Sequence, residues 1–187
     1  QDFVDSGQVA DFATSELAHK LENFAAVLED EISLFGTTTD VDGDGKFNIL
    51  FTQQVNELSA NKSSITTGYF YAVDLFGASS YAQSNETEII YAAIPDPAGE
   101  YGATISSSFA YSNIIPSVLP HELQHLINFN QHYFLNEKSI EQSFLNEGLS
   151  HLAEDIYSMG GSGYMEQTGI ENYSRVAQYL AASDSIC

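Results

Sequence analysis

The chain has 187 residues, of which 43% are hydrophobic, enough for the core of one domain but few for two. It holds 26 Asp and Glu against five Lys and Arg, and the formal net charge of -21 repels nucleic acid phosphates and anionic membranes. We therefore expect no nucleic acid and no membrane partner. The sequence contains no uninterrupted run of about 18 apolar residues, so it predicts no membrane-spanning helix. The only cysteine, Cys187, predicts no disulfide within the chain and no thiolate metal cluster.

The first predicted element is an amphipathic helix over residues 7–35, because apolar residues recur there at helical spacing. Gly36 follows at the natural C-terminal stop of such a helix. An Asp- and Gly-rich loop at 40–45 separates this helix from a region of strands. Three strands rich in Ile, Tyr and Phe are predicted there, at 47–51, 66–73 and 87–94.

The second half of the chain is predicted to be mainly helical. Pro, Gly and Ser residues first predict a loop over 95–112, with a short edge strand near 103–109. Helical periodicity returns after Ile115, and Pro116 and Pro120 place the helix start between them, because proline is tolerated only in the first turn. Helices are predicted at about 117–130, 141–158 and 170–182, with a Gly-Gly-Ser-Gly stretch at 160–163 before the last one.

This order of elements, a helix, then strands, then helices, predicts the α+β class. We expect a single domain over 1–187. Its N-terminal α/β part reaches to about residue 132, and a helical part follows from about residue 133.

His121-Glu122-Leu123-Gln124-His125 is an H-E-x-x-H motif inside the helix predicted at 117–130. Because residues four apart share one helical face, both imidazoles can bind one metal ion. Glu122 can then act as the general base toward a water bound to that ion. By chance, this spacing would arise in well under about one per cent of chains of this length, which disfavours the alternative of two histidines and a solvated glutamate on a helix face.

A catalytic zinc usually has three protein ligands and one open position, so a third ligand is expected downstream. Glu147 on the helix predicted at 141–158 is the candidate. A histidine as third ligand would require Gly at 128 and His at 131 in an extended motif, but these positions hold Asn128 and Gln131. His132 would lie about 10 Å further along the helix axis than His125, and we interpret it as a surface or packing residue.

Ser150, His151 and Glu154 share a helical face with Glu147. Zinc-bound histidines usually donate their second N–H to a carboxylate, so Glu154 or Asp155 could orient one ligand, with a solvated acidic helix end as the alternative. His151 could instead stabilise a developing oxyanion. Further candidate donors for the oxyanion are Tyr157, Tyr164 and Tyr173.

The loop Asp40-Val41-Asp42-Gly43-Asp44-Gly45 matches the first six positions of a calcium-binding loop, in which alternate Asp side chains converge and Gly permits a sharp turn. The twelfth position is Phe51 rather than glutamate, so a bidentate ligand must come from elsewhere. The alternative is an ordinary Asp-Gly turn that leads into a strand. The expected calcium ligands are Asp40, Asp42, Asp44, the backbone carbonyl of Lys46, and Asn48.

Three stretches together resemble the hyicolysin family of secreted zinc metallopeptidases, one of the gluzincin families with two His ligands and one Glu ligand. They are HELQHLINFN at 121–130, FLNEGLS at 144–150 and AED at 153–155. Weaker similarity extends to residues 84–91, to 68–70 and to the Asp-rich loop. The resemblance implies a zincin-like fold, secretion and peptide hydrolysis. His151 departs from thermolysin-like enzymes, which have Asp at this position and a catalytic His further downstream.

From the motif and the resemblance we expect a secreted, monomeric endopeptidase that hydrolyses protein or peptide substrates with a zinc-activated water, and calcium as a structural cofactor. One alternative is a non-catalytic secreted surface protein that binds zinc and calcium. Glu122 argues against it, since structural zinc sites favour closed, Cys-rich shells without an open position. A zinc hydrolase of a non-peptide substrate is a second alternative, which the motif does not separate from a peptidase.

Overall fold

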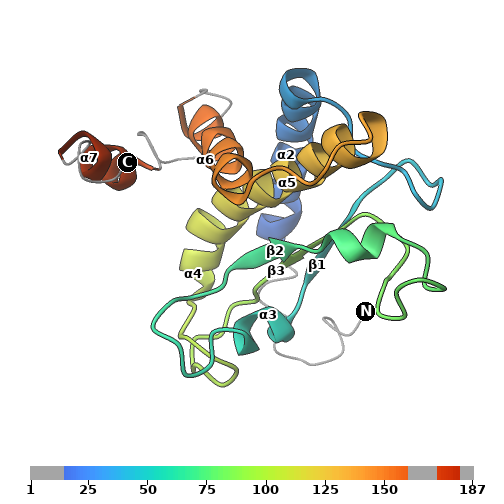
Figure 1. Cartoon of the computed structure of the whole chain (residues 1–187). Coiled ribbons are helices and arrows are strands. Elements are labelled where there is room, and N and C mark those ends of the chain that lie inside the picture. The colour runs from blue at the N-terminus through green and yellow to red at the C-terminus, as the bar shows by residue number, and fades with distance from the viewer. Residues whose placement is uncertain (1–14, 160–171, 182–187) are drawn as a thin grey trace.

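The computed structural model describes residues 15–159 and 172–181. A long helix comes first, a small sheet follows, and the remaining chain is mostly helical (Figure 1), so the predicted α+β class is confirmed. The first half contains α2 (Ser15–Phe35), β1 (Asn48–Phe51), α3 (Gln53–Glu57), β2 (Gly68–Phe70), the 3-10 helix η1 (Ala72–Leu75) and β3 (Ile89–Ala92). The second half contains α4 (Ser107–Phe109), η2 (Ala110–Val118), α5 (Leu119–Phe129), η3 (Asn130–Leu135), α6 (Ser143–Met159) and α7 (Tyr173–Ala181).

The sheet has three strands in the order β1-β3-β2. Strand β1 pairs with β3 in parallel, with Asn48 opposite Ile89, and β2 pairs with β3 in antiparallel fashion, with Tyr69 opposite Tyr91. The central strand β3 is the most deeply buried, which suits its run of apolar residues. Strand β2 forms one edge of the sheet, beside α5.

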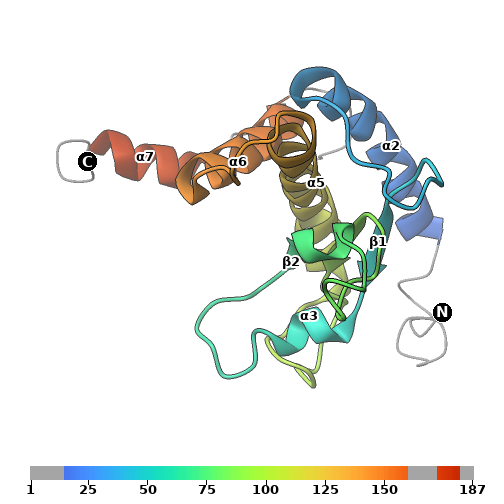
Figure 2. The same cartoon turned by 45° about the vertical axis from the view of Figure 1, so that its right-hand side comes forward.

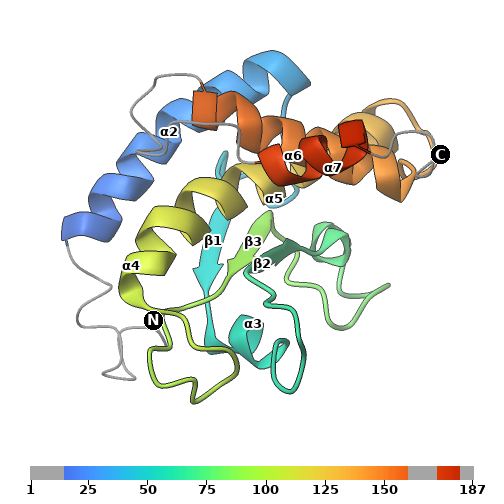
Figure 3. The ribbon, with the colours of Figure 1, turned by 90° about the vertical axis from the view of Figure 1, so that its left-hand side faces the viewer.

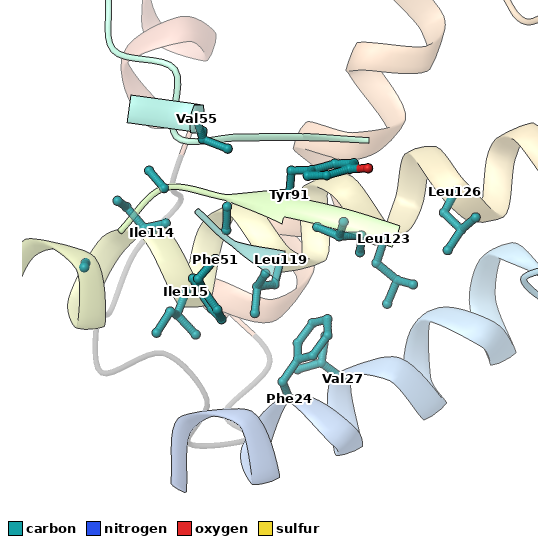
Figure 4. Close-up of a cluster of buried hydrophobic side chains, with 14 of the residues drawn as sticks. Phe24, Val27, Phe51, Val55, Tyr91, Ile114, Ile115, Leu119, Leu123 and Leu126 are labelled. Carbon is teal, nitrogen blue, oxygen red and sulfur yellow. The ribbon is translucent and has the colours of Figure 1, made fainter. Parts of the chain in front are cut away.

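The hydrophobic core lies between α2, the sheet and α5 (Figure 4). Helix α2 contributes Phe24 and Val27, whose spacing places both on one face. Helix α5 contributes Leu119, Leu123 and Leu126, all fully buried. One face of α5 is thus committed to the core, which leaves its other face for polar side chains.

The helix that carries the H-E-x-x-H motif begins earlier than predicted. Helical backbone starts at Ser107, after Ser106 caps it by accepting a hydrogen bond from the Phe109 N–H at 3.1 Å. Pro116 therefore lies inside the helix, contrary to the prediction, within the π-helical segment η2. A π turn widens the helix locally, which accommodates a residue that has no N–H and whose ring would clash in a regular α-helix. The helix also continues beyond residue 130, as the π-helical segment η3.

The prediction of an edge strand near 103–109 is wrong. Ile105 forms only an isolated antiparallel bridge with Asp96, and helical structure begins at Ser107. The strand predicted at 66–73 is shorter, because η1 follows β2 directly. Helix α3 was not predicted, and the Thr52 side chain caps it. The start of the helix predicted at 7–35, the 160–163 stretch and the ends of the last predicted helix lie outside the described residues.

Helix α6 packs against α5, and α7 lies beyond α6 on the side away from α2 (Figures 1 and 2). The continuous α4–η2–α5 rod runs across the sheet (Figure 3). Within the described part of the chain, no helix has the length and apolar character needed to cross a membrane.

Candidate metal centre

Helix α5 places His121 and His125 on the side away from the core leucines, and Glu122 lies between these two sides. Helix α6 faces the side of the histidines and is joined to α5 by hydrogen bonds between polar side chains. The Ser150 hydroxyl donates to Oε1 of Gln124 at 2.8 Å, and both residues are buried. These bonds set the position of α6 so that Glu147 lies next to the two histidines.

The two imidazoles and the Glu147 carboxylate converge on one point. The Nε2 atoms of His121 and His125 lie 3.1 Å apart. The Glu147 oxygens lie 3.5 Å from Nε2 of His121 and 3.7 Å from Nε2 of His125. One ligand atom from each of the three residues therefore lies within the range expected for a shared metal ion.

The second ring nitrogen of each histidine is engaged elsewhere. Nδ1 of His121 lies 2.5 Å from Oε1 of Glu154, which can only accept, so Nδ1 is the donor. Nδ1 of His125 lies 3.0 Å from Oγ of Ser150, whose own hydrogen is directed to Gln124. When Nδ1 is the donor in both rings, both Nε2 atoms present lone pairs on the side of Glu147.

In this neutral tautomer, two nitrogen lone pairs and a carboxylate face one another. This set of donors fits a cation, and zinc in particular, which prefers imidazole and carboxylate ligands in tetrahedral geometry. Bonds of about 2.0–2.1 Å in a tetrahedron separate the ligand atoms by about 3.3–3.4 Å. The observed separations of 3.1, 3.5 and 3.7 Å lie around this value.

Glu154 lies between two histidines. Its Oε1 is 2.5 Å from Nδ1 of His121 and 3.0 Å from Nδ1 of His151, and its side chain is only 9% exposed. The three residues also form a second group that could hold a metal ion. These contacts have hydrogen-bond length, however, and are shorter than the separation of ligands around one zinc ion. Burial opposes the charge of Glu154, but the hydrogen bonds from His121 and His151 lower its pKa to about 2, so it accepts as a carboxylate.

Glu122 lies beside the converging ligand atoms and is 7% exposed. Its Oε2 accepts a hydrogen bond from the backbone N–H of Phe70 at 2.9 Å, so the edge strand β2 holds this carboxylate in place. Burial raises the pKa of Glu122 to about 7, although the charge of His121 and the Phe70 N–H oppose the rise. A carboxyl group with a pKa near neutrality can both accept and release a proton.

The histidines respond differently to their surroundings. Burial lowers the pKa of His125, and the neighbouring His121 lowers it further, which favours the neutral form that a metal requires. Burial also opposes the charge of His121, but the hydrogen bond to Glu154 and the nearby carboxylates outweigh it and raise the pKa of His121.

Two cavities border the site. The main cavity, of about 480 Å³, is lined by β2, by the polar side of α5, and by residues 140, 141, 146 and 147. His121, Glu122 and Glu147 also line a second cavity of about 510 Å³, next to His151 and α7. The ligand cluster is therefore open to small molecules from both sides.

The sequence-predicted donors are distributed unevenly around these cavities. His151 lines the second cavity and is held by Glu154 and Arg175. Tyr157 lines neither cavity; it is buried, and burial raises its pKa. Tyr173 is 68% exposed on α7. Tyr164 lies outside the described residues, and Asp155 accepts a hydrogen bond from the Asn172 backbone N–H at 3.0 Å.

Three features of the site were missed from sequence. Phe70, which anchors Glu122, was not identified because strand pairing across the sheet cannot be read from the motif. His132 lines the main cavity, with Nε2 3.0 Å from Glu141, because the helix continues as η3. The hydrogen bond from Asn128 to Asn146 joins α5 and α6, and both residues lie within the stretches that carry the family resemblance.

The predicted calcium loop is exposed and precedes β1. Oxygens of Asp40 and Asp42 lie close together, and the third member of their group is Glu88, which sequence reasoning did not name. Asp44 does not belong to this group of side chains, and the Asn48 side-chain N–H donates to Thr87 at 3.0 Å. The backbone carbonyl of Lys46 stays a predicted ligand.

Comparisons with known proteins identify one relevant similarity. The chain is 31% identical over 124 residues to the neutral metalloprotease ShpI of Staphylococcus hyicus. The aligned region covers 66% of this chain and 26% of the relative, so the chain matches about a quarter of that protein's length. No family model matches the chain, and no solved structure matches it. The similarity supports a relationship of this chain to metalloproteases, and the His and Glu cluster on α5 and α6 is a group that could hold a metal ion.

Proposed function

We propose that this chain is a zinc-dependent endopeptidase of the hyicolysin-like gluzincin type, with His121, His125 and Glu147 as zinc ligands and Glu122 as general base. One observation carries the proposal. The Nε2 lone pairs of both histidines face the Glu147 carboxylate at 3.1–3.7 Å, while hydrogen bonds to Glu154 and Ser150 engage the opposite nitrogen of each ring. A cation bound between these three groups would be coordinated by all of them.

Zinc bound there would polarise a substrate carbonyl and lower the pKa of a water molecule to about 7. Glu122 would accept the proton that the attacking water loses and would return it to the leaving amine. The Phe70 N–H keeps Oε2 of Glu122 in position, which leaves the other carboxylate oxygen for the proton. Glu154 fixes the ring of His121 so that its Nε2 points toward the site.

The main cavity supplies the space for a substrate. It runs between the edge strand β2 and the polar side of α5, so an extended peptide beside β2 would pass both Glu122 and Glu147. The side chains that line the cavity include Tyr69, Phe129 and Ile140, which offer apolar surface to substrate side chains. We accordingly propose protein or peptide substrates rather than a smaller non-peptide molecule.

The wider assignments belong to the same proposal. The elements that supply the site, β2, α5 and α6, are joined by direct contacts, which supports a single zincin-like domain over 1–187. We propose secretion from the resemblance to secreted peptidases, and a monomer that uses neither nucleic acid nor a membrane, given the net charge of -21.

The proposal is tested by incubating the protein with a denatured protein mixture and mapping the new termini by mass spectrometry. We expect internal cuts that disappear when a zinc chelator is added and return when zinc is restored. Protein that retains one zinc ion per chain but produces no cuts would contradict the proposal and favour the non-catalytic zinc-binding alternative.

A further inference from the structure

We propose that Glu88 completes a calcium site with Asp40 and Asp42, and that this site joins the loop before β1 to the start of β3. The proposal concerns a cluster separate from the zinc-binding residues and does not depend on peptidase activity. It supplies the carboxylate ligand that the loop itself lacks, because the twelfth position of the calcium-loop pattern is Phe51.

Hydrogen bonds from backbone N–H groups to Asp side chains within the Asp-rich loop hold its shape. The Gly45 N–H donates to Oδ1 of Asp40 at 3.0 Å, and the Asp44 N–H donates to Oδ1 of Asp42 at 3.2 Å. Gly43 and Gly45 have φ of 75° and 70°, a conformation that glycine adopts without strain. These contacts shape the loop, but they do not by themselves indicate a ligand.

Glu88 provides the independent observation. Glu88 directly precedes β3 and is fully buried, with 0% exposure. Its Oε1 accepts from the Val41 N–H at 2.7 Å and from the Thr39 hydroxyl at 2.5 Å. Its Oε2 is buried and has no hydrogen-bond partner among the described residues. A buried carboxylate oxygen without a donor is costly, so a missing partner is expected beside it.

The neighbours of Glu88 indicate that this partner is a cation. One oxygen from each of Asp40, Asp42 and Glu88 lies within 4.8 Å of the others. The Thr87 hydroxyl, next to Glu88 in sequence, donates to Oδ2 of Asp42 at 2.8 Å and so holds this side chain at the start of β3. Carboxylates this close repel one another unless a cation lies between them.

The chemistry of the cluster selects calcium. Its side-chain ligands are all oxygens, which excludes the softer metals that prefer nitrogen and sulfur. The loop is exposed and leaves room for water and backbone carbonyls, and calcium accepts six to eight oxygens in flexible geometry, whereas magnesium demands a strict octahedron. Glu88 is the one buried member, so binding would tie the exposed loop to the sheet.

The test is isothermal titration of the zinc-loaded full chain with calcium chloride, followed by thermal melting in excess calcium and in a calcium-selective chelator. We expect one calcium ion per chain and a higher melting temperature with calcium. Magnesium chloride should bind more weakly. No heat of binding together with unchanged melting would overturn the proposal.

The variant Glu88→Gln should weaken calcium binding at least tenfold. Its amide oxygen can still accept from Val41 and Thr39, so the fold is retained while the second negative oxygen is lost. The control Glu57→Gln removes the same charge from an exposed position on α3 and should leave calcium binding unchanged. Asp42→Asn, in the exposed loop, should also weaken binding. Parental affinity in Glu88→Gln would overturn the proposal. Zinc content and peptide hydrolysis are measured separately, so the proposed function can fail without affecting this result.

Discussion

Glu154 is the residue whose hydrogen bonds most directly orient a proposed zinc ligand. The change Glu154→Gln keeps the size of the side chain but replaces the carboxylate that holds Nδ1–H of His121. The amide oxygen can still accept from His121, but the negative charge that strengthens this hydrogen bond is lost, so we expect zinc affinity to fall by about tenfold, the lower end of the range for changes to the partner of a metal-binding histidine. Competition with a zinc-binding dye measures this change. Glu57→Gln, an exposed position, serves as the control, and unchanged zinc affinity in Glu154→Gln would contradict this role.

At the residue scale, spacing along a helix predicted much of the candidate site. His121 and His125 are four residues apart, so they share a face on any regular helix, and Glu154 shares the face of Glu147 for the same reason. Partners from other elements could not be predicted, because a backbone N–H such as that of Phe70 has no signature in sequence. The contact of Glu88 with the calcium loop was missed for the same reason.

At the scale of elements, the close approach of β2 to its neighbours depends on Gly68. A Cβ atom at this position would lie 2.4 Å from Cγ1 of Val118 and 2.7 Å from the carbonyl oxygen of Tyr91. Gly68→Ala should therefore push β2 outward, destabilise the fold by about 1–3 kcal/mol, and disturb the contact between Phe70 and Glu122. Urea unfolding and casein hydrolysis measure the two effects.

The control for this variant is Gly77→Ala. A Cβ atom at Gly77 would make ordinary contacts, 3.5 Å from Oγ of Ser79 and 3.7 Å from Oε1 of Glu86. Gly68→Ala with the stability and hydrolysis rate of this control would show that β2 does not depend on the glycine.

Helix α2 buries an acidic residue, Glu31, with 0% exposure. Neither of its carboxylate oxygens has a hydrogen-bond partner within the described ranges. Burial raises its pKa from 4.5 to about 9. Between these two values the folded chain keeps a proton that the unfolded chain releases, so the free energy of unfolding falls as pH rises, by up to about 1.4 kcal/mol per pH unit.

Glu31→Gln should remove this part of the pH dependence. The variant and the parent should have similar stability near pH 5, and the variant should become the more stable of the two as pH rises to 8. Urea unfolding at several pH values measures the difference, with Glu29→Gln, exposed on the same helix, as control. A difference from the parent that stays constant from pH 5 to 8 would be inconsistent with a buried, protonated Glu31.

Element type was predictable where hydrophobic periodicity was strong. Helices α2 and α6 and strands β1 and β3 fall within or close to their predicted ranges, because apolar spacing decides which face can be buried. Predictions from local sequence rules, such as the rule that proline ends a helix, failed where packing in the folded chain stabilises the exception. Pro116 would end an isolated α-helix, but the buried side chains of Ile114 and Ile115 keep η2 packed on the core through a π-helical segment.

On the scale of the whole molecule, three elements far apart in sequence meet at the candidate site. Helix α5 supplies two imidazoles and Glu122, α6 supplies Glu147 and Glu154, and β2 supplies the backbone N–H that donates to Glu122. The α+β class followed from the order of elements, but the strand order β1-β3-β2 did not, since long-range pairing leaves little trace in local sequence.

The central claim is that Glu122 acts as a base beside zinc, and the most direct measurement is casein hydrolysis by Glu122→Gln together with its zinc content. The amide oxygen can still accept from the Phe70 N–H, so the fold and all three proposed ligands are retained. We predict one zinc ion per chain, as in the parent, and a rate lower by about 10²- to 10⁴-fold, since the amide cannot accept a proton. Hydrolysis at the parental rate by the zinc-loaded variant would contradict the account.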